Sequence, residues 1–137
     1  MIKIGKDISK FSAYSCQPTS KKDLVLIMSA RFSKEGHKCD LNDIDVSLIT
    51  DMSFLFYDSK FNGDISNCNV SNVVNMTRMF AFSKFDGDIS GWDVRKVRDM
   101  SYMFYDAKFT GDISNWKINK NCNTTQMRVQ EQSLTSK

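Results

Sequence analysis

The sequence feature that most constrains the fold is a six-residue phrase that recurs every 24 residues. The phrase occupies 61–66 and returns at 85–90 and 109–114, always as Phe-x-Gly-Asp-Ile-Ser. The flanking residues keep the same register, so three blocks align without a gap: 51–74, 75–98 and 99–122. A period of about 20 to 50 residues is typical of proteins in which each repeat contacts only its neighbours. The sequence therefore predicts one right-handed solenoid of stacked coils.

Within each block the spacing of apolar residues changes. Met76, Met79 and Phe80 recur at helical spacing, as in a short helix or a single helical turn. Residues 85–92 read as extended, with a turn at Gly87, where glycine can supply unusual backbone angles. We therefore expect an α/β fold, with a short parallel strand and a helical turn in every coil. The expected core repeats in each coil: Phe56, Phe80 and Phe104; Phe61, Phe85 and Phe109; and Ile65, Ile89 and Ile113.

A helix is expected before the repeats. Thr19 or Ser20 can cap its first turn, and Gly36 suits its end, so the pattern predicts a capping helix over 20–34. A degenerate copy of the repeat begins near Met28, and a closing half-coil follows the last full block. We interpret the chain as a single domain, 1–137, in three parts: an N-terminal segment with the capping helix at 1–36, the repeat solenoid at 37–128 and a flexible tail at 129–137.

Charge and apolar content argue against several classes of partner. The net charge is only +3, and acidic and basic residues are mixed through the repeats, whereas nucleic-acid binders cluster Lys and Arg on one face. The first residues lack the apolar stretch of a signal peptide. The longest apolar run, Leu24 to Met28, is too short to span a bilayer. We therefore expect a cytoplasmic protein without a membrane segment, and nucleic acid is disfavoured as a partner.

The sequence contains no evident catalytic or metal-binding motif. The four cysteines show no CxxC spacing, and the single histidine, His37, is accompanied by no nucleophile motif. We therefore expect no enzyme activity, no metal and no cofactor. The row Asp64, Asp88 and Asp112 could hold calcium, but it offers one carboxylate per coil to an ion that takes about six to eight oxygens. We favour Asx turns, in which each carboxylate accepts backbone N–H groups.

Two other rows are interpreted as structural. Lys60, Lys84 and Lys108 each precede an aspartate of the Asp row by four residues. A structural role is favoured over a phosphate site: the two rows could pair into a charge lattice, or the long lysine stems could cover the phenylalanines beneath them. Trp92 and Trp116 share their repeat position with Cys68. A position that accepts both Trp and Cys is typical of a buried stripe, and this favours a core role over a platform for bases or sugars.

Two stretches carry a resemblance to a known family. Residues 65–73 and 99–104 resemble the "DISNWDVSNVTDMSYMF" repeat of the BspA-like leucine-rich-repeat proteins, a group first noted as mycoplasma surface lipoproteins of unknown function. The resemblance extends over about 37–127. It implies a leucine-rich-repeat-like solenoid that binds other macromolecules, without catalysis or a cofactor. Members of the family are often large, secreted and adhesive, and related short proteins occur in phages and large viruses.

Positions at which the repeats differ are the candidates for a binding surface, because the shared fold does not dictate them. The variable positions of the helical turns mix aromatic residues with arginine, types enriched at binding hot spots. The predicted partner-binding residues are Phe54, Tyr57, Arg78, Phe82, Tyr102 and Tyr105. The alternative is a loop set: Asn69, Asp93, Lys96, Lys117 and Lys120.

The favoured function is a non-catalytic protein-binding module. We expect a small intracellular binder or inhibitor of a host protein, of the kind found in phages and viruses, that is a monomer or a weak homo-oligomer. A fragment of a bacterial surface adhesin is the alternative.

Overall fold

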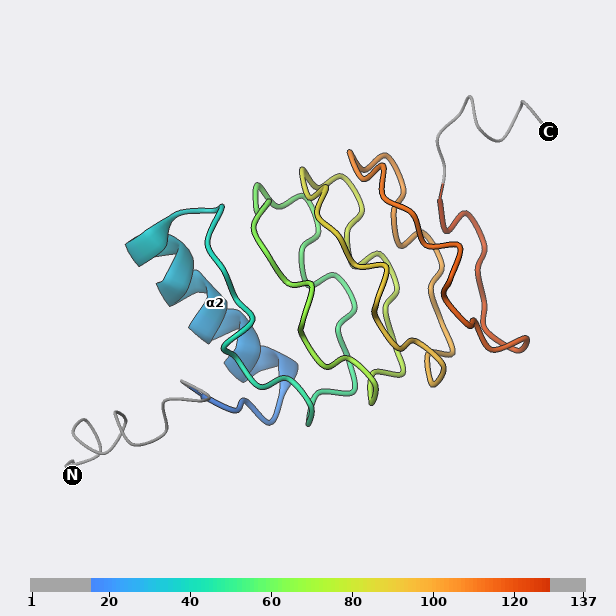
Figure 1. Ribbon diagram of the computed structural model, residues 1–137, viewed down its shortest axis with the longest axis horizontal. Helices are drawn as coiled ribbons and strands as arrows, with labels where there is room; N and C mark the ends of the chain where they lie inside the picture. The colour runs from blue at the N-terminus through green and yellow to red at the C-terminus, as the bar shows by residue number, and fades with distance from the viewer. Residues whose placement is uncertain (1–15, 129–137) are drawn as a thin grey trace.

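A single helix and a stack of irregular coils make up the structure. The computed structural model describes residues 16–128. The helix, α2 (Lys21–Glu35), lies at one end, and the coils follow side by side toward the C-terminal end (Figure 1). Each repeat of the sequence forms one turn of this stack, because a residue pairs with the residue 24 positions later, as Asp51 does with Asn75 and Asn75 with Asp99.

The predicted α/β leucine-rich-repeat-like solenoid is wrong. Among residues 16–128, α2 is the only helix, and the coils meet through isolated parallel bridges instead of strands, so no sheet forms. The spacing of Met76, Met79 and Phe80 comes from consecutive tight turns and not from a helix. The stretch 85–92, which reads as extended, contains no strand.

The turn-built side of each coil uses its backbone N–H groups in two alternating ways. Every second residue donates to a carbonyl of the next coil, as Phe56 does to Met79 at 2.8 Å and Phe80 to Met103 at 2.9 Å. The residues between them close tight turns within the coil, as Leu55 does with the carbonyl of Met52 at 3.2 Å. This alternation satisfies the buried backbone without regular secondary structure.

The predicted capping helix is confirmed. Ser20 is the N-cap of α2 and accepts the N–H of Asp23 at 3.1 Å, and Gly36 ends the helix at a φ of 87°. Leu24 and Met28 face the core. Phe32 stacks on Phe61 of the first coil, with ring centroids 5.4 Å apart.

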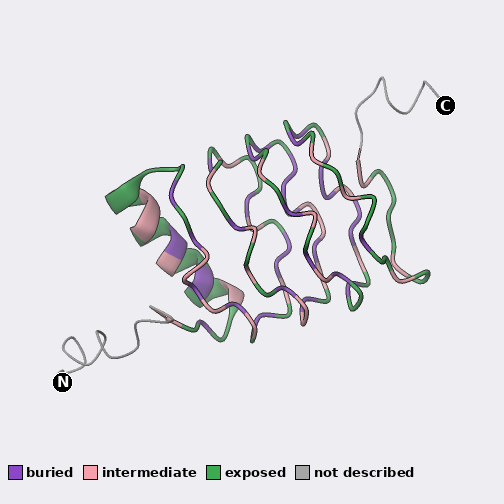
Figure 2. Cartoon of the chain, viewed as in Figure 1, coloured by how far each residue is buried: buried purple, intermediate pink, exposed green. Residues whose placement is uncertain are grey.

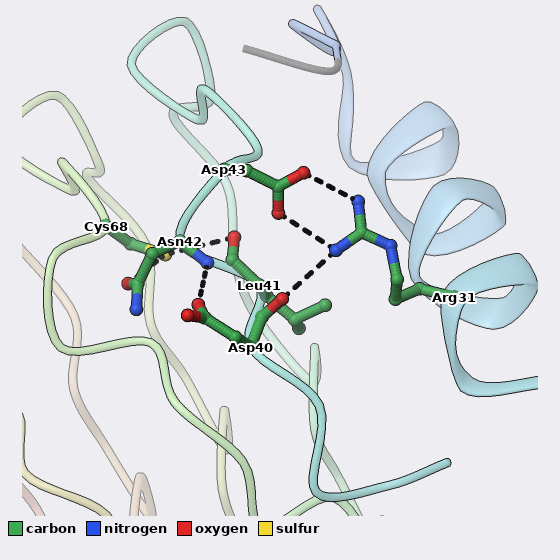
Figure 3. Close-up of polar contacts among 6 residues, drawn as sticks. All are labelled: Arg31, Asp40, Leu41, Asn42, Asp43 and Cys68. Carbon is green, nitrogen blue, oxygen red and sulfur yellow. Dashed lines mark hydrogen bonds and ion pairs between the residues drawn. The ribbon is translucent and has the colours of Figure 1, made fainter. Parts of the chain in front are cut away.

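Two basic side chains tie α2 to the coils that follow. Near its start, the amine of Lys21 donates to the carbonyl and the hydroxyl of Ser53 at 3.0 and 2.9 Å. Near its end, the guanidinium of Arg31 binds both carboxylate oxygens of Asp43 at 2.9 and 3.0 Å and the carbonyl of Asp40 at 3.0 Å (Figure 3). The helix therefore covers the first coil in a defined orientation.

Columns of stacked aromatic rings fill the interior. Phe80 lies 5.4 Å from Phe56 and 5.5 Å from Phe104, with the three rings nearly parallel. Buried residues recur at the same place in successive coils (Figure 2). The predicted phenylalanine columns are confirmed as core, as are Ile65 and Ile89, whereas Ile113 is only partly buried.

Glycine in the repeated phrase has a different role from the expected one. Among the described residues, Gly36 is the only glycine with a positive φ, so Gly87 does not supply an unusual backbone angle. A Cβ atom at Gly87 would instead come within 2.8 Å of the ring of Phe85. The glycine makes room for the core aromatic two residues before it, and the same contact recurs between Gly111 and Phe109 at 2.5 Å.

The last coil is closed by a half-coil, as the sequence predicts. Asp99 bridges to Asn123, and Phe104 donates to the carbonyl of Met127 at 2.7 Å. The predicted tail at 129–137 and the first 15 residues of the predicted N-terminal segment lie outside the described residues. The division into three parts stays a prediction.

Truncating Phe80 to Ala is expected to lower the free energy of unfolding by about 3–5 kcal/mol, because it removes a fully buried ring from the middle of the phenylalanine column. Phe82→Ala in the same coil is the matched control, since Phe82 is 41% exposed and should cost much less. Chemical denaturation of both variants measures the difference. Equal losses would contradict the stacked core.

Candidate functional site

The six predicted partner-binding residues lie together on the surface. We call them the aromatic strip: Phe54, Tyr57, Arg78, Phe82, Tyr102 and Tyr105. They come from three successive coils, yet each one contacts another member. The structure brings the six residues together, and their role in binding stays a prediction.

Edge-to-face ring contacts connect one side of the strip. The ring of Phe82 lies between those of Tyr57 and Tyr105, at centroid distances of 5.7 and 5.6 Å and steep angles of 80° and 77°. Tyr57 also contacts Phe54 at 5.3 Å, and Tyr105 contacts Tyr102 at 5.4 Å. Edge-to-face pairs of this kind hold rings in defined orientations.

Arg78 closes the strip on its other side. Its guanidinium carbon lies 4.5 Å from the ring centroid of Tyr102 and 5.9 Å from that of Phe54, which are cation–π distances. The side chain of Arg78 makes no hydrogen bond or ion pair within the described part of the chain. The rings therefore hold the guanidinium in place while its N–H groups stay available.

Three aromatic side chains of the strip are exposed to solvent. Phe54, Tyr57 and Phe82 are 47%, 43% and 41% exposed. Single exposed apolar residues are ordinary, but a contiguous group of them commonly marks an interaction site.

Phe82 is explained by its neighbour Ala81. The first and third coils place Tyr and Asp at these two positions, whereas the middle coil has Ala and Phe. Ala81 is buried, and the ring of Phe82 lies between those of Tyr57 and Tyr105. The paired exchange keeps an aromatic ring in every coil of the strip.

Four of the six residues have a left-handed backbone. The φ angles are 60° at Phe54, 51° at Arg78, 59° at Phe82 and 57° at Tyr102. For residues other than Gly, Asn and Asp this conformation costs roughly 1–2 kcal/mol, and in a tight turn the place is usually taken by glycine. Strain of this kind concentrates at functional sites. Sequence reasoning missed it, because no glycine marks these positions.

The Asp row forms turns, as the favoured interpretation predicts. Oδ1 of Asp64, Asp88 and Asp112 accepts the N–H group two residues later, each at 2.9 Å. These backbone hydrogen bonds, with a second bond from the serine hydroxyl, lower the pKa of all three carboxyls. Within residues 16–128, no three His, Cys, Asp or Glu side chains are placed to hold a metal ion.

The lysine row does not pair with the Asp row. No ion pair joins Lys60, Lys84 or Lys108 to it in the part of the chain that the structure describes, so the predicted charge lattice is wrong.

The buried stripe is confirmed for Trp92 and Trp116, whereas Cys68 is only partly buried. The indole N–H groups of Trp92 and Trp116 donate to the carbonyls of Ile65 and Ile89 at 3.0 and 2.9 Å. At the equivalent place in the first coil, burial raises the pKa of the Cys68 thiol to about 12.

Two residues of the alternative loop set already have partners within the chain. Asp93 forms an ion pair with Arg95 at 2.8 Å, and the amine of Lys96 donates to Asn72 at 2.9 Å. Among residues 16–128, no hydrogen bond, ion pair or ring contact joins this set to the aromatic strip. His37 lies exposed beside the ring of Phe32.

Residues 27–137 match the family described as "Mycoplasma protein of unknown function, DUF285". The chain belongs to this family. The match to DUF285 begins one residue before Met28, where the degenerate copy of the repeat starts. No curated protein and no solved structure matches the chain. No helix within residues 16–128 is long and apolar enough to cross a membrane.

The Arg78→Gly variant is expected to have a free energy of unfolding about 1 kcal/mol higher than the Arg78→Ala variant. Both substitutions delete the side chain, but only glycine adopts the left-handed backbone of this position without strain. At the neighbouring Thr77, which has no positive φ, the order should reverse by about 0.5–1 kcal/mol. Urea denaturation of the four variants tests this. Alanine matching or exceeding glycine at Arg78 would show that the backbone is not strained.

The contribution of the Asp row to stability is expected to be complete above about pH 5 and to be lost progressively as the pH falls through and below the unfolded pKa of Asp. The reason is that the folded state holds the pKa values of Asp64, Asp88 and Asp112 below their usual value, so protonation favours unfolding. Replacing all three by Asn keeps the acceptor oxygen and should make the decline shallower. Thermal melting between neutral and acidic pH measures it, with Asp106→Asn as a control outside the row.

Proposed function

We propose that the chain is a non-catalytic protein-binding module and that the aromatic strip is its contact surface. The observation that carries the proposal is that six variable positions from three coils converge into one surface cluster, in which Phe54, Tyr57 and Phe82 are exposed and the other three are half-buried. The repeated core does not need these side chains, since the same positions differ from coil to coil.

The composition of the strip suits a protein partner. Tyr and Phe bring large contact area with few rotatable bonds, and hot spots of protein interfaces are enriched in Tyr and Arg. The rings are already held by one another, so little side-chain freedom is lost on binding. A nucleic acid is the weaker candidate, because the strip carries a single cation, Arg78.

Backbone strain supports the same proposal. Bulky residues occupy left-handed positions at Phe54, Arg78, Phe82 and Tyr102, where the scaffold alone would be more stable with glycine. A binding role explains why side chains are kept at this cost.

The resemblance to the BspA-like repeat proteins supports macromolecular binding as the general role. Within this proposal, the partner is a host protein and the chain acts inside the cell as a binder or inhibitor of the phage or virus type. The alternative, a fragment of a surface adhesin, would have a partner on the outside of a host cell.

Affinity capture from host lysate tests the proposal. The bait is the full chain, compared with a strip variant in which Phe54, Arg78, Phe82 and Tyr102 are Ala. In the matched control variant, the residues of the loop set are Ala instead: Asn69, Asp93, Lys96, Lys117 and Lys120. We expect one protein partner that is retained by the control and lost by the strip variant, with both variants melting cooperatively.

Two results would contradict the proposal. Capture that survives in the strip variant and is lost in the loop variant would move the contact surface to the loops. A partner taken only from a fraction of host surface proteins would favour the adhesin alternative.

A further inference from the structure

We propose that the partner presents a carboxylate to Arg78, an apolar side chain to the rings beside it, and a basic side chain to the acidic edge of the strip. This inference rests on the proposed function, because it names the chemistry that the aromatic strip would recognise. It is carried by a separate observation, the distribution of charges across the strip.

Arg78 is prepared to bind a planar anion. Its guanidinium is held against Tyr102 at 4.5 Å, and its N–H fork has no partner in residues 16–128. Asp99 interacts electrostatically with Arg78, but its carboxylate accepts the N–H of Ser101 at 2.8 Å and forms no ion pair with the guanidinium. A guanidinium already oriented in this way loses little freedom when it forms a bidentate pair with a carboxylate.

Two acids lie at the other edge of the strip. Asp58 and Asp106 occupy the repeat position of Phe82 in the first and third coils, four residues after the column formed by Phe54, Arg78 and Tyr102. Backbone hydrogen bonds join these turns, from Asp58 to Ala81 and from Phe82 to Tyr105. Both are exposed, and neither side chain has an ion pair or hydrogen bond within the described residues. Two coil spacings of about 4.8 Å separate them, which places roughly 10 Å between the two backbone positions.

The charges across the strip therefore follow one order: a cation at one edge, aromatic rings in the middle and a pair of anions at the other edge. A protein segment with an acidic residue, an apolar anchor and a basic residue in the corresponding order complements all three parts. A polyanion such as a nucleic acid or a phosphorylated surface would meet the repulsion of Asp58 and Asp106. The charges thus favour a protein segment of mixed charge.

Selection of binders from a displayed library of random linear peptides tests this directly. The immobilised baits are the wild-type chain, Arg78→Lys and Arg78→Glu, with Lys117→Glu as a control of identical charge change outside the strip. We expect wild-type binders to share an Asp or Glu beside an apolar residue. Arg78→Lys should weaken them about tenfold, since it keeps the charge but loses the fork. Arg78→Glu should abolish their binding and select Lys or Arg instead, while Lys117→Glu should leave it unchanged.

Other outcomes separate this inference from the proposed function. The same peptides could bind the Arg78→Glu variant with the affinity of the wild-type chain but fail to bind the Phe82→Asp variant. The strip would then bind proteins without discriminating by charge, and only this inference would be overturned. If they bind all strip variants equally, or if no peptide is enriched, both proposals fail. Concentration-dependent self-association of the wild-type chain in sedimentation, lost in Arg78→Glu, would overturn it in favour of a second copy as occupant.

Discussion

The structure depends on one kind of interaction, the backbone hydrogen bond between neighbouring coils. On the turn-built side these bonds all point the same way, as from Phe54 to Thr77 and from Arg78 to Ser101, at 2.9 and 3.0 Å. The peptide groups therefore align along the stack, as they do along a helix. Lys21 of α2 places its amine on the carbonyl of Ser53, at the end where the carbonyls point outward. The helix thus completes the stack electrostatically as well as by packing.

This bonding pattern also creates the surface of the molecule. Alternating bonds between and within coils place left-handed residues at regular positions, and one such column holds Phe54, Arg78, Tyr102 and Gln126. The residues two positions later, Phe56 and its repeats, point into the core. One side of every coil therefore combines an invariant interior with an exterior that is free to vary. A scaffold of this type can change its binding surface without changing its core.

Stability and proposed binding make opposite demands on the same positions. The backbone would favour glycine, asparagine or aspartate at left-handed sites, and Asp58 and Asp106 follow that preference. Phe82 does not, and its ring joins Tyr57 to Tyr105. In a family whose function is unknown, this departure is the physical reason for looking at the aromatic strip first.

The sequence by itself determined the 24-residue period, the capping helix and the core columns, because each of these follows from side-chain pattern. It also singled out six variable positions as candidates, but their contacts with one another are visible only in the structure. Only the tertiary structure decided the backbone. Helical spacing at Met76, Met79 and Phe80 arises equally from a helix or from successive turns, and the choice depends on hydrogen bonds to residues 24 positions away. For the same reason, the left-handed angle at Arg78 and the ordinary angle at Gly87 could not be read from residue type. Neighbouring coils hold the angle at Arg78, and position 87 is a glycine because the ring of Phe85 leaves no room for a Cβ atom, not because the backbone needs an unusual angle.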